Sequence, residues 1–210
     1  MSARAPITVL TPTIPGREVL LAECVASVTA QTVEVANHLI CSQSCSENLP
    51  SPVHCARMQN ALLPAVRTEW TMRLADDDLL LPHHVATLLP ALEPGVDVVY
   101  SWDEASNRPR IDCTGWPQEK LIHELGKTSW IDGSAVAIRT DMLVGVGGWP
   151  HKAVGRPPFH GHFSGFPEAV TCEDHACFYR LACQGAKFVC IPQETWVYRA
   201  GAWGRISEEE

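Results

Sequence analysis

Three consecutive aspartates, Asp76, Asp77 and Asp78, follow an apolar run at 70–74 that is predicted to be a strand. Ligands of open α/β sheets bind outside the carboxyl ends of strands, so the triplet stands where a ligand is expected. Adjacent carboxylates repel one another unless a cation neutralises them, and such oxygen ligands suit Mg²⁺ or Mn²⁺ bridging to substrate phosphates. A single Asp would be enough to cap the helix that follows. The triplet therefore predicts a site for a divalent metal and phosphate.

A second pair of carboxylates, Glu173 and Asp174, lies at the start of the last predicted helix, at 171–184. Thr171 with Asp174 three residues later is similar to a capping box. One of the two carboxylates could instead be a general base, which must lie within hydrogen-bond reach of the proton it removes. The spacing alone leaves both roles open, cap and catalyst.

The elements that must position these residues alternate along the chain. Apolar runs with strand character alternate with segments of helical periodicity, which indicates an α/β fold with helices flanking a mostly parallel sheet. We expect one domain over 1–210, with a Gly-, Pro- and His-rich loop at 147–167 as a lid or acceptor-binding loop and a short acidic tail at 207–210. The expected strands are 7–10, 38–41, 70–74, 96–102 with a possible hairpin to Ile111, 131–138, 187–191 and 195–199; the expected helices are 17–31, 56–66, 82–92, 116–125, 140–144 and 171–184.

Composition excludes several classes of protein. The 210 residues include 16 Lys and Arg against 24 Asp and Glu, a formal charge of −8 without a basic stripe, so binding of nucleic acid driven by bulk charge is not indicated. The apolar stretches are shorter than the roughly 20 residues of a membrane span, and residues 1–6 lack the apolar region of a signal peptide. We therefore expect a cytoplasmic protein whose nine cysteines are reduced and mostly buried.

Several segments, taken together and in this order, resemble family 2 glycosyltransferases of the GT-A fold, a Rossmann-like nucleotide-diphospho-sugar transferase fold. The resemblance extends from Ile7 to about Gly201, over nearly the whole chain. The segments that carry it are Thr11-Pro12-Thr13 with Arg17, Arg57 with Asn60-Ala61-Leu62, Ala75 to Pro82, Val146-Gly147-Gly148-Trp149, and Glu173-Asp174-His175 with Arg180-Leu181-Ala182 and Gly185.

The resemblance implies a glycosyltransferase that moves a sugar from a UDP-, GDP- or dTDP-sugar to a hydroxyl acceptor, with inversion and with Mn²⁺ or Mg²⁺ as cofactor. It assigns residues 76–78 to the DXD motif, with Asp78 as the first metal ligand and Asp76 as another candidate. It also implies that Asp174, or else Glu173, is the catalytic base. The metal would offset charge on the leaving diphosphate while the base deprotonates the acceptor.

The same resemblance implies a pocket for the nucleotide sugar. Trp149, beside two glycines, is a further candidate because its large apolar face suits stacking on a sugar. The residues expected to line the pocket are Thr11, Pro12, Thr13, Arg17, Ser42, Arg57, Asp76, Asp77 and Trp149.

The chain departs from the family pattern at three places. Ser42 stands where many relatives have an Asp that contacts the base, and Ala75 stands at the first acidic position of the longer motif. Residues 198–201 lack the histidine that some relatives use as a metal ligand, and a substitute could come from His160 or His162 in the loop.

Two other classes of function stay open at this stage. One is another enzyme that uses a metal and a nucleotide, such as a nucleotidyltransferase or a phosphohydrolase. The other is a non-catalytic relative that binds a sugar nucleotide or a partner protein. The acceptor is not readable from the sequence: a saccharide, a protein, a lipid and a hydroxylated nucleobase all remain possible.

Overall fold

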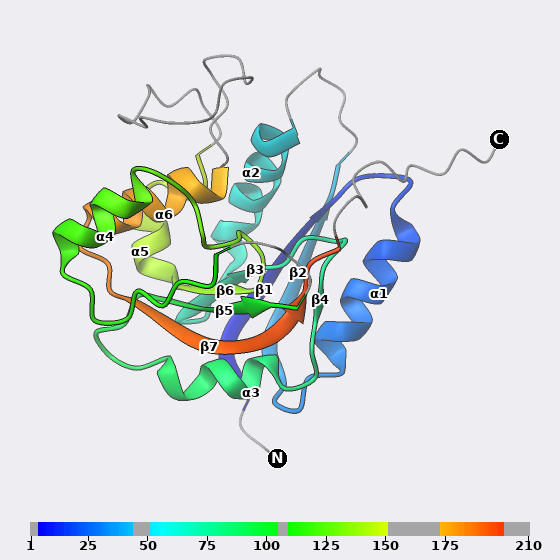
Figure 1. Ribbon diagram of the computed structural model, residues 1–210. Coiled ribbons are helices and arrows are strands. Elements are labelled where there is room, and N and C mark those ends of the chain that lie inside the picture. Colours follow the sequence, from blue (N-terminus) through cyan, green and yellow to red (C-terminus); the bar gives the residue numbers. More distant parts are fainter. Residues whose placement is uncertain (1–3, 44–50, 105–108, 151–172, 200–210) are drawn as a thin grey trace.

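The computed structural model describes residues 4–43, 51–104, 109–150 and 173–199, which form a seven-stranded sheet with helices on both faces (Figure 1). The strand order is β2-β1-β3-β6-β5-β7-β4. The elements are β1 (Ala5–Thr13), α1 (Glu18–Thr29), β2 (Val35–Ser42), α2 (Ser51–Leu62), β3 (Trp70–Arg73), β4 (Leu79–Leu80), α3 (His84–Leu88), β5 (Val98–Asp103), α4 (Gln118–Leu125), β6 (Val136–Arg139), α5 (Thr140–Gly145), α6 (Glu173–Cys183) and β7 (Phe188–Val197), with short 3₁₀ turns at Leu63–Ala65 and Leu89–Ala91.

The sheet is mostly parallel, which confirms the expected α/β fold class. Strand β1 pairs parallel with β2 and β3, and β5 pairs parallel with β7, whereas β6 runs antiparallel to its neighbours β3 and β5. The two-residue β4 pairs antiparallel with β7. One edge of the sheet therefore contains the amino end of β6 together with the carboxyl ends of β1, β2, β3, β5 and β7.

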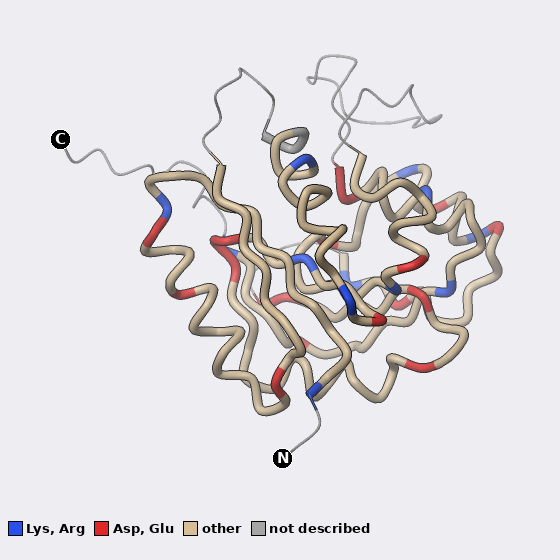
Figure 2. The backbone as a smooth tube through the Cα atoms, turned by 180° about the vertical axis from the view of Figure 1, so that it is seen from behind, with Lys and Arg blue, Asp and Glu red and all other residues tan. Residues whose placement is uncertain are grey.

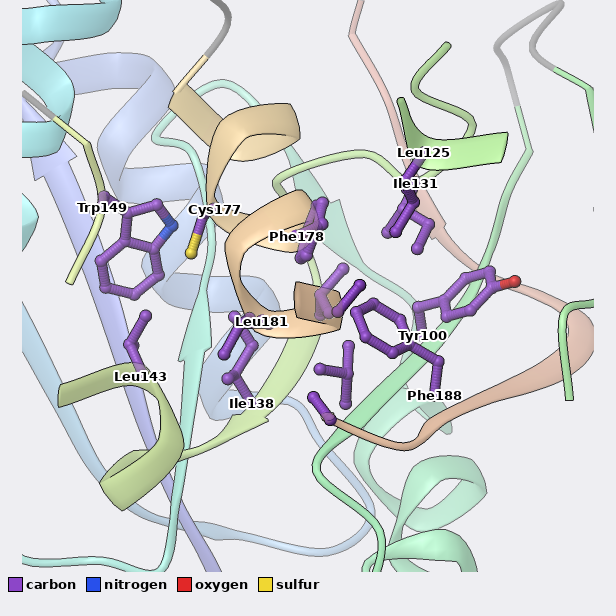
Figure 3. Close-up of a cluster of buried hydrophobic side chains, with 14 of the residues drawn as sticks. Tyr100, Leu125, Ile131, Ile138, Leu143, Trp149, Cys177, Phe178, Leu181 and Phe188 are labelled. Carbon is purple, nitrogen blue, oxygen red and sulfur yellow. The ribbon is translucent and has the colours of Figure 1, made fainter. Parts of the chain in front are cut away.

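Two hydrophobic cores, one on each face, hold this sheet. On one face, α1 and α3 bury Cys24, Val28 and Val85 against β1 and β3. On the other, α6 buries Cys177, Phe178 and Leu181 against side chains from β5, β6 and β7, and α4 and α5 pack on the same side (Figure 3). Positions 177, 178 and 181 share one helix face, because residues three and four apart are neighbours on a helix.

The boundaries differ from the sequence-based expectation in a few places. The hairpin from β5 to Ile111 is wrong, because β5 is an interior strand between β6 and β7. The helix expected at 82–92 is interrupted: α3 has five residues and a 3₁₀ turn containing Pro90 follows it. Proline lacks the N–H that a continuing helix requires. The two last expected strands form the single strand β7.

Some expected features lie outside the described residues. They are the larger part of the loop at 147–167, the cap residue Thr171, the loop histidines His160 and His162, and the acidic tail at 207–210.

A double hydrogen bond joins two of the segments quoted above. The side-chain amide of Asn60 on α2 donates to the carbonyl of Trp149 at 2.7 Å and accepts from its N–H at 2.9 Å. Gly148 has a φ of +74°, and a Cβ there would lie 2.2 Å from the Asn60 side-chain oxygen. The glycine is required twice, for the left-handed backbone and for the close approach of Asn60. The segment around Trp149 thus fixes the end of α5 against α2.

The described cysteines and charges agree with the composition. All seven described cysteines are free, and five of them are buried. Figure 2 shows acidic and basic residues distributed over the described backbone, with no run of Lys and Arg along any element. No helix among the described residues is both long enough and apolar enough to cross a membrane.

A buried histidine should make stability depend on pH. His84 is fully buried and hydrogen-bonds Thr195 through Nδ1 at 2.7 Å; burial, helped by repulsion from His83, lowers its pKa to about 3. His84 stays neutral in the folded chain but is protonated below about pH 6.5 in the unfolded chain. A falling pH therefore favours the unfolded chain and lowers the free energy of unfolding. We expect the free energy of unfolding to decrease more steeply with falling pH in wild type than in His84→Asn. The difference between the two slopes should be about 1.4 kcal/mol per pH unit between roughly pH 6 and 4.

Urea unfolding at a series of pH values measures this difference. The matched control is His123→Asn, on the exposed side of α4, whose profile should parallel that of wild type. Equal slopes for wild type and His84→Asn would contradict the prediction.

Candidate active site

The first two aspartates of the triplet lie in a buried polar cluster at the end of β1. The hydroxyl of Thr13, the last residue of β1, donates to Asp76 Oδ2 at 2.6 Å. Arg17, which directly precedes α1, places Nη2 2.8 Å from Asp76 Oδ1 and 2.7 Å from Asp77 Oδ2. Burial raises the pKa of Asp76, and the Thr13 hydroxyl and the Arg17 charge oppose that rise. Arg17 is itself only 4% exposed, so this cation is committed to the two carboxylates.

The third aspartate, Asp78, has different surroundings. It is 2% exposed, and Oδ1 accepts the backbone N–H of Arg199 at 3.2 Å. Burial raises its pKa to about 7, repulsion from Asp132 and Asp77 adds to the rise, and a hydrogen bond with Ser134 opposes it. Asp78 thus stands in a part of the cluster where negative charge is in excess.

Arg199, just after β7, closes the turn that carries the triplet. Its side chain donates to the carbonyl of Asp77 and forms an ion pair with Glu23 on α1. The end of β7 is therefore tied both to the triplet and to α1.

The second carboxylate pair is also buried, at the start of α6. Arg73, the last residue of β3, forms an ion pair with Glu173 in which Nη2 lies 2.9 Å from Oε1. Burial alone would lower the pKa of Arg73. The negative charges of Glu173 and Asp174 outweigh this effect and raise the pKa. Asp174 Oδ1 accepts the N–H of His175 at 2.6 Å. Arg73 thereby fixes the first turn of α6 to the sheet through Glu173.

A turn at 132–134, just before β6, connects the two carboxylate clusters. On one side, the Ser134 hydroxyl accepts the N–H of Ala75 at 3.0 Å, next to the triplet. On the other side, Gly133 lies against Arg73 and Asp174: a Cβ at position 133 would be 2.4 Å from Arg73 Nη1 and 2.8 Å from Asp174 Oδ2. The turn brings two carboxylate clusters that are about a hundred residues apart in the sequence to one edge of the sheet.

We expect the absence of a side chain at Gly133 to be essential for both activity and stability. We expect Gly133→Ala to lower kcat by at least tenfold and to destabilise the fold by about 1–3 kcal/mol, because the added methyl group displaces Arg73 or Asp174. The matched control is Gly145→Ala at the end of α5, where a Cβ would meet nothing within 4 Å. Steady-state kinetics and thermal unfolding of both variants test this, and a Gly133→Ala variant as active as Gly145→Ala would refute it.

The other residues expected in the nucleotide pocket lie at the same edge or near it. Ser42, exposed at the end of β2, pairs in register with Thr13, and Pro12 pairs with Cys41. Thr11 is fully buried, with its hydroxyl 2.8 Å from His38 Nε2, and Arg57 is exposed on α2. Contacts of these residues with a nucleotide stay predictions.

Trp149 requires a correction. The indole is 1% exposed and lies in the hydrophobic core beside Leu143 and Cys177 (Figure 3). A side chain buried on all sides has no face to offer to a sugar, so the expected stacking role is wrong. The conformation of Gly147 and Gly148 and the contact with Asn60 direct this residue inward.

Sequence reasoning missed four residues of the site: Arg73, Asp132, Gly133 and Ser134. Arg73 is a single basic residue at the end of an apolar strand, and 132–134 fell within an expected strand. The one available signal was the pair Gly133-Ser134, because glycine within a strand pattern often marks a close backbone approach.

Comparison with known proteins rests on structure alone, because neither a protein-family model nor a curated protein matches the sequence. A mannosyltransferase from Pyrobaculum calidifontis, solved with GDP-Man and Mn²⁺, superposes with a TM-score of 0.61 at 14% identity, over 96% of this chain and 60% of that one. S. aureus TarS 1–349 with UDP-GlcNAc gives 0.61 at 12% identity, over 97% and 61%. The chain has the GT-A fold.

A third structure with the GT-A fold was solved with a different set of ligands. Drosophila β1,4-galactosyltransferase 7, as the D211N mutant with manganese, UDP-Gal and xylobiose, gives a TM-score of 0.59 at 14% identity, over 97% of this chain and 76% of that one. This GT-A chain spans only about 60% of the length of the mannosyltransferase and of TarS 1–349.

Proposed function

We propose that this GT-A chain is a glycosyltransferase that moves a sugar from a nucleotide-diphosphate donor to a hydroxyl acceptor. The observation that carries the proposal is the pair of buried carboxylate clusters at one edge of the sheet, connected by the turn at 132–134. Sugar transfer needs two functions side by side, one that neutralises the leaving diphosphate and one that removes the acceptor proton. The structural neighbours solved with GDP-Man, UDP-GlcNAc and UDP-Gal support a nucleotide-sugar donor.

The first cluster is assigned to the donor. Thr13, Arg17 and Ser42 lie where the nucleotide would enter, at the ends of β1 and β2, and Asp76 and Asp77 would face the ribose and phosphates. Arg17 holds both aspartates in place and removes most of their repulsion. This arrangement keeps the triplet turn rigid before a donor arrives.

The residues present fit a divalent cation at Asp78. A buried carboxyl whose pKa is raised to about 7 beside Asp132 and Asp77 has surplus negative charge that a cation would neutralise. Among the described residues no three His, Cys, Asp or Glu side chains form a preassembled metal cluster, so water and the donor phosphates would supply the remaining ligands. When bound, Mn²⁺ or Mg²⁺ would stabilise the charge that develops on the leaving diphosphate.

Asp76 is the weaker candidate for a metal ligand. Thr13 occupies one of its carboxylate oxygens and Arg17 the other. Under the proposal this residue orients the donor, and a ligand role for it remains a prediction.

We assign the second cluster to removal of the proton from the acceptor hydroxyl. Asp174 takes the proton of the acceptor hydroxyl, the acceptor oxygen forms a bond to the anomeric carbon, and the bond from that carbon to the diphosphate oxygen breaks. Attack opposite the leaving group in one displacement inverts the anomeric centre. Glu173 is engaged by Arg73, so it positions Asp174 and is not free to act as the base.

A screen of donors tests the proposal. We would measure the melting temperature of the chain with UDP-, GDP- and dTDP-sugars, with and without Mn²⁺ or Mg²⁺, and identify transfer products by mass spectrometry. A ligand at 100 times its Kd adds about 2.7 kcal/mol of stability, a shift of several degrees. The matching sugar 1-phosphates, which lack the nucleotide, are the control. The proposal fails if none of the nucleotide sugars stabilises the chain.

A further inference from the structure

Arg199, two residues after the end of β7, is bound through only part of its side chain. Its backbone N–H donates to Asp78 Oδ1 at 3.2 Å, and its side-chain Nε donates to the carbonyl of Asp77. Nη1 forms an ion pair with Glu23 on α1. The third side-chain nitrogen, Nη2, is buried and has no hydrogen-bond partner among the described residues. A buried donor without a partner is costly, so this nitrogen requires an explanation.

The ion pair between Arg199 and Glu23 is weaker than the ion pairs that hold Arg17. The Glu23 side chain is 51% exposed and that of Arg199 is 22% exposed. Exposed ion pairs contribute little to stability, because water already solvates both charges and dissolved salt screens them. Arg17, by contrast, pairs with Asp76 and Asp77, whose side chains are 8% and 4% exposed. A negatively charged ligand can therefore take Arg199 from Glu23, whereas Arg17 stays with its two carboxylates.

The position and chemistry of Arg199 suit a diphosphate. Its backbone is bound to Asp78, the proposed metal ligand, and its guanidinium lies at the carbonyl of Asp77 in the same turn. A divalent cation that is shared with the Asp78 carboxylate leaves part of the charge of a diphosphate uncompensated. Arginine presents its N–H groups as a planar fork that matches two phosphate oxygens, and it stays charged at any working pH. The free Nη2 of Arg199 is one donor of such a fork.

We propose that Arg199 binds the diphosphate of the donor and supplies positive charge beside the metal. The proposal rests on the glycosyltransferase function proposed above and adds a residue to its donor site. Glu23 holds the guanidinium until a donor binds. Nη1 and Nη2 then turn to phosphate oxygens, and the half-exposed Glu23 carboxylate is left to water.

The same contact stabilises the departing group in the transfer reaction. When the bond between the anomeric carbon and the diphosphate oxygen breaks, the electron pair stays on that oxygen. Arg199 keeps its proton throughout, because a guanidinium is not deprotonated in proteins, and its N–H groups stabilise the new negative charge. The proton of the acceptor hydroxyl goes to Asp174, as proposed above.

Calorimetry with inorganic pyrophosphate and Mg²⁺ tests the proposal without a sugar or a base, and UDP, GDP and dTDP are titrated in the same way. Arg199→Met keeps the apolar stem of the side chain and removes the charge, so we expect it to weaken binding of each diphosphate by about tenfold or more. Arg199→Lys keeps the charge without the fork, and its affinity should lie between those of wild type and Arg199→Met.

A second variant distinguishes binding of the ligand from a purely structural role. Glu23→Gln removes the carboxylate that competes for Arg199 and should raise the affinity for pyrophosphate by about threefold or more. Loss of a structural tie would lower that affinity or leave it unchanged. The gain should vanish when Arg199→Met is added to Glu23→Gln, because the released cation is then missing. The matched control is Glu34→Gln, which breaks the exposed ion pair with Arg4 at the opposite edge of the sheet and should leave the affinity unchanged.

The outcomes separate this inference from the proposed function. If wild type binds none of the diphosphates, or if Arg199→Met binds them as tightly as wild type, the inference is overturned. A Glu23→Gln variant without increased affinity overturns it as well. In each of these cases, stabilisation of the chain by a nucleotide sugar leaves the glycosyltransferase assignment standing. If pyrophosphate binding depends on Arg199 but no nucleotide sugar stabilises the chain, the proposed function fails while the diphosphate site is retained.

Discussion

Asp174→Asn is expected to lower kcat by about 10²–10⁴, the usual contribution of a general base, while the affinity for the donor stays unchanged. The substitution keeps the shape of the side chain and the oxygen that accepts the N–H of His175, but it removes the ability to take a proton. Stopped-assay kinetics give kcat, and calorimetry with the donor and Mn²⁺ gives the affinity. Full turnover by this variant would mean that another group is the base.

Glu173→Gln is the informative companion of that variant. Glu173 is 5% exposed and paired with Arg73, so losing its charge leaves a buried guanidinium without its partner. Breaking a buried pair costs about 3–5 kcal/mol. We expect this variant to lower the melting temperature more than Asp174→Asn does, because Glu173 forms the direct ion pair with Arg73 and Asp174 contributes less to its compensation. The two neighbouring carboxylates are thereby separated into a positioning residue and a catalytic one.

Asp78→Asn is expected to weaken metal-dependent binding of the donor by about a hundredfold or more, because removing even an outer-shell partner of a metal typically costs 10–100-fold. Burial raises the pKa of Asp78 to about 7, so a proton competes with the metal below that pH. The Mn²⁺ affinity of wild type should therefore fall about tenfold for each pH unit below 7. Calorimetry between pH 6 and 8 measures both effects.

Two controls accompany this experiment. Asp141→Asn, at an exposed position in the first turn of α5, should bind the donor like wild type. Asp78→Asn itself should melt at a higher temperature than metal-free wild type at pH 8, because it removes a buried charge with too little compensation. A donor affinity that Mn²⁺ raises equally in wild type and in Asp78→Asn would exclude Asp78 as a ligand.

The part of the site that could be predicted from sequence is the part encoded by local pattern. The acidic triplet begins three residues after the end of β3, and Thr13 and Ser42 end neighbouring parallel strands, so their position at one edge follows from strand order alone. The start of α6 carries its two acidic residues where helix termini favour them. Each of these inferences needs only a few adjacent residues.

The missed residues depend on contacts between distant segments. Arg73 becomes part of the site through Glu173, a hundred residues later, and nothing near Arg73 in the sequence indicates that partner. Trp149 looked like a ligand-binding aromatic because glycines precede it, but Asn60 binds its backbone and the indole enters the core. Tertiary packing decided both cases.

The turn at 132–134 has a consequence for attempts to redesign this chain. Ser134 binds the backbone beside the triplet, and its neighbour Gly133 lies against Asp174, so two consecutive residues contact both carboxylate clusters. A substitution at either position is expected to disturb the two clusters together. Libraries that aim at new products would therefore do better to leave this turn intact.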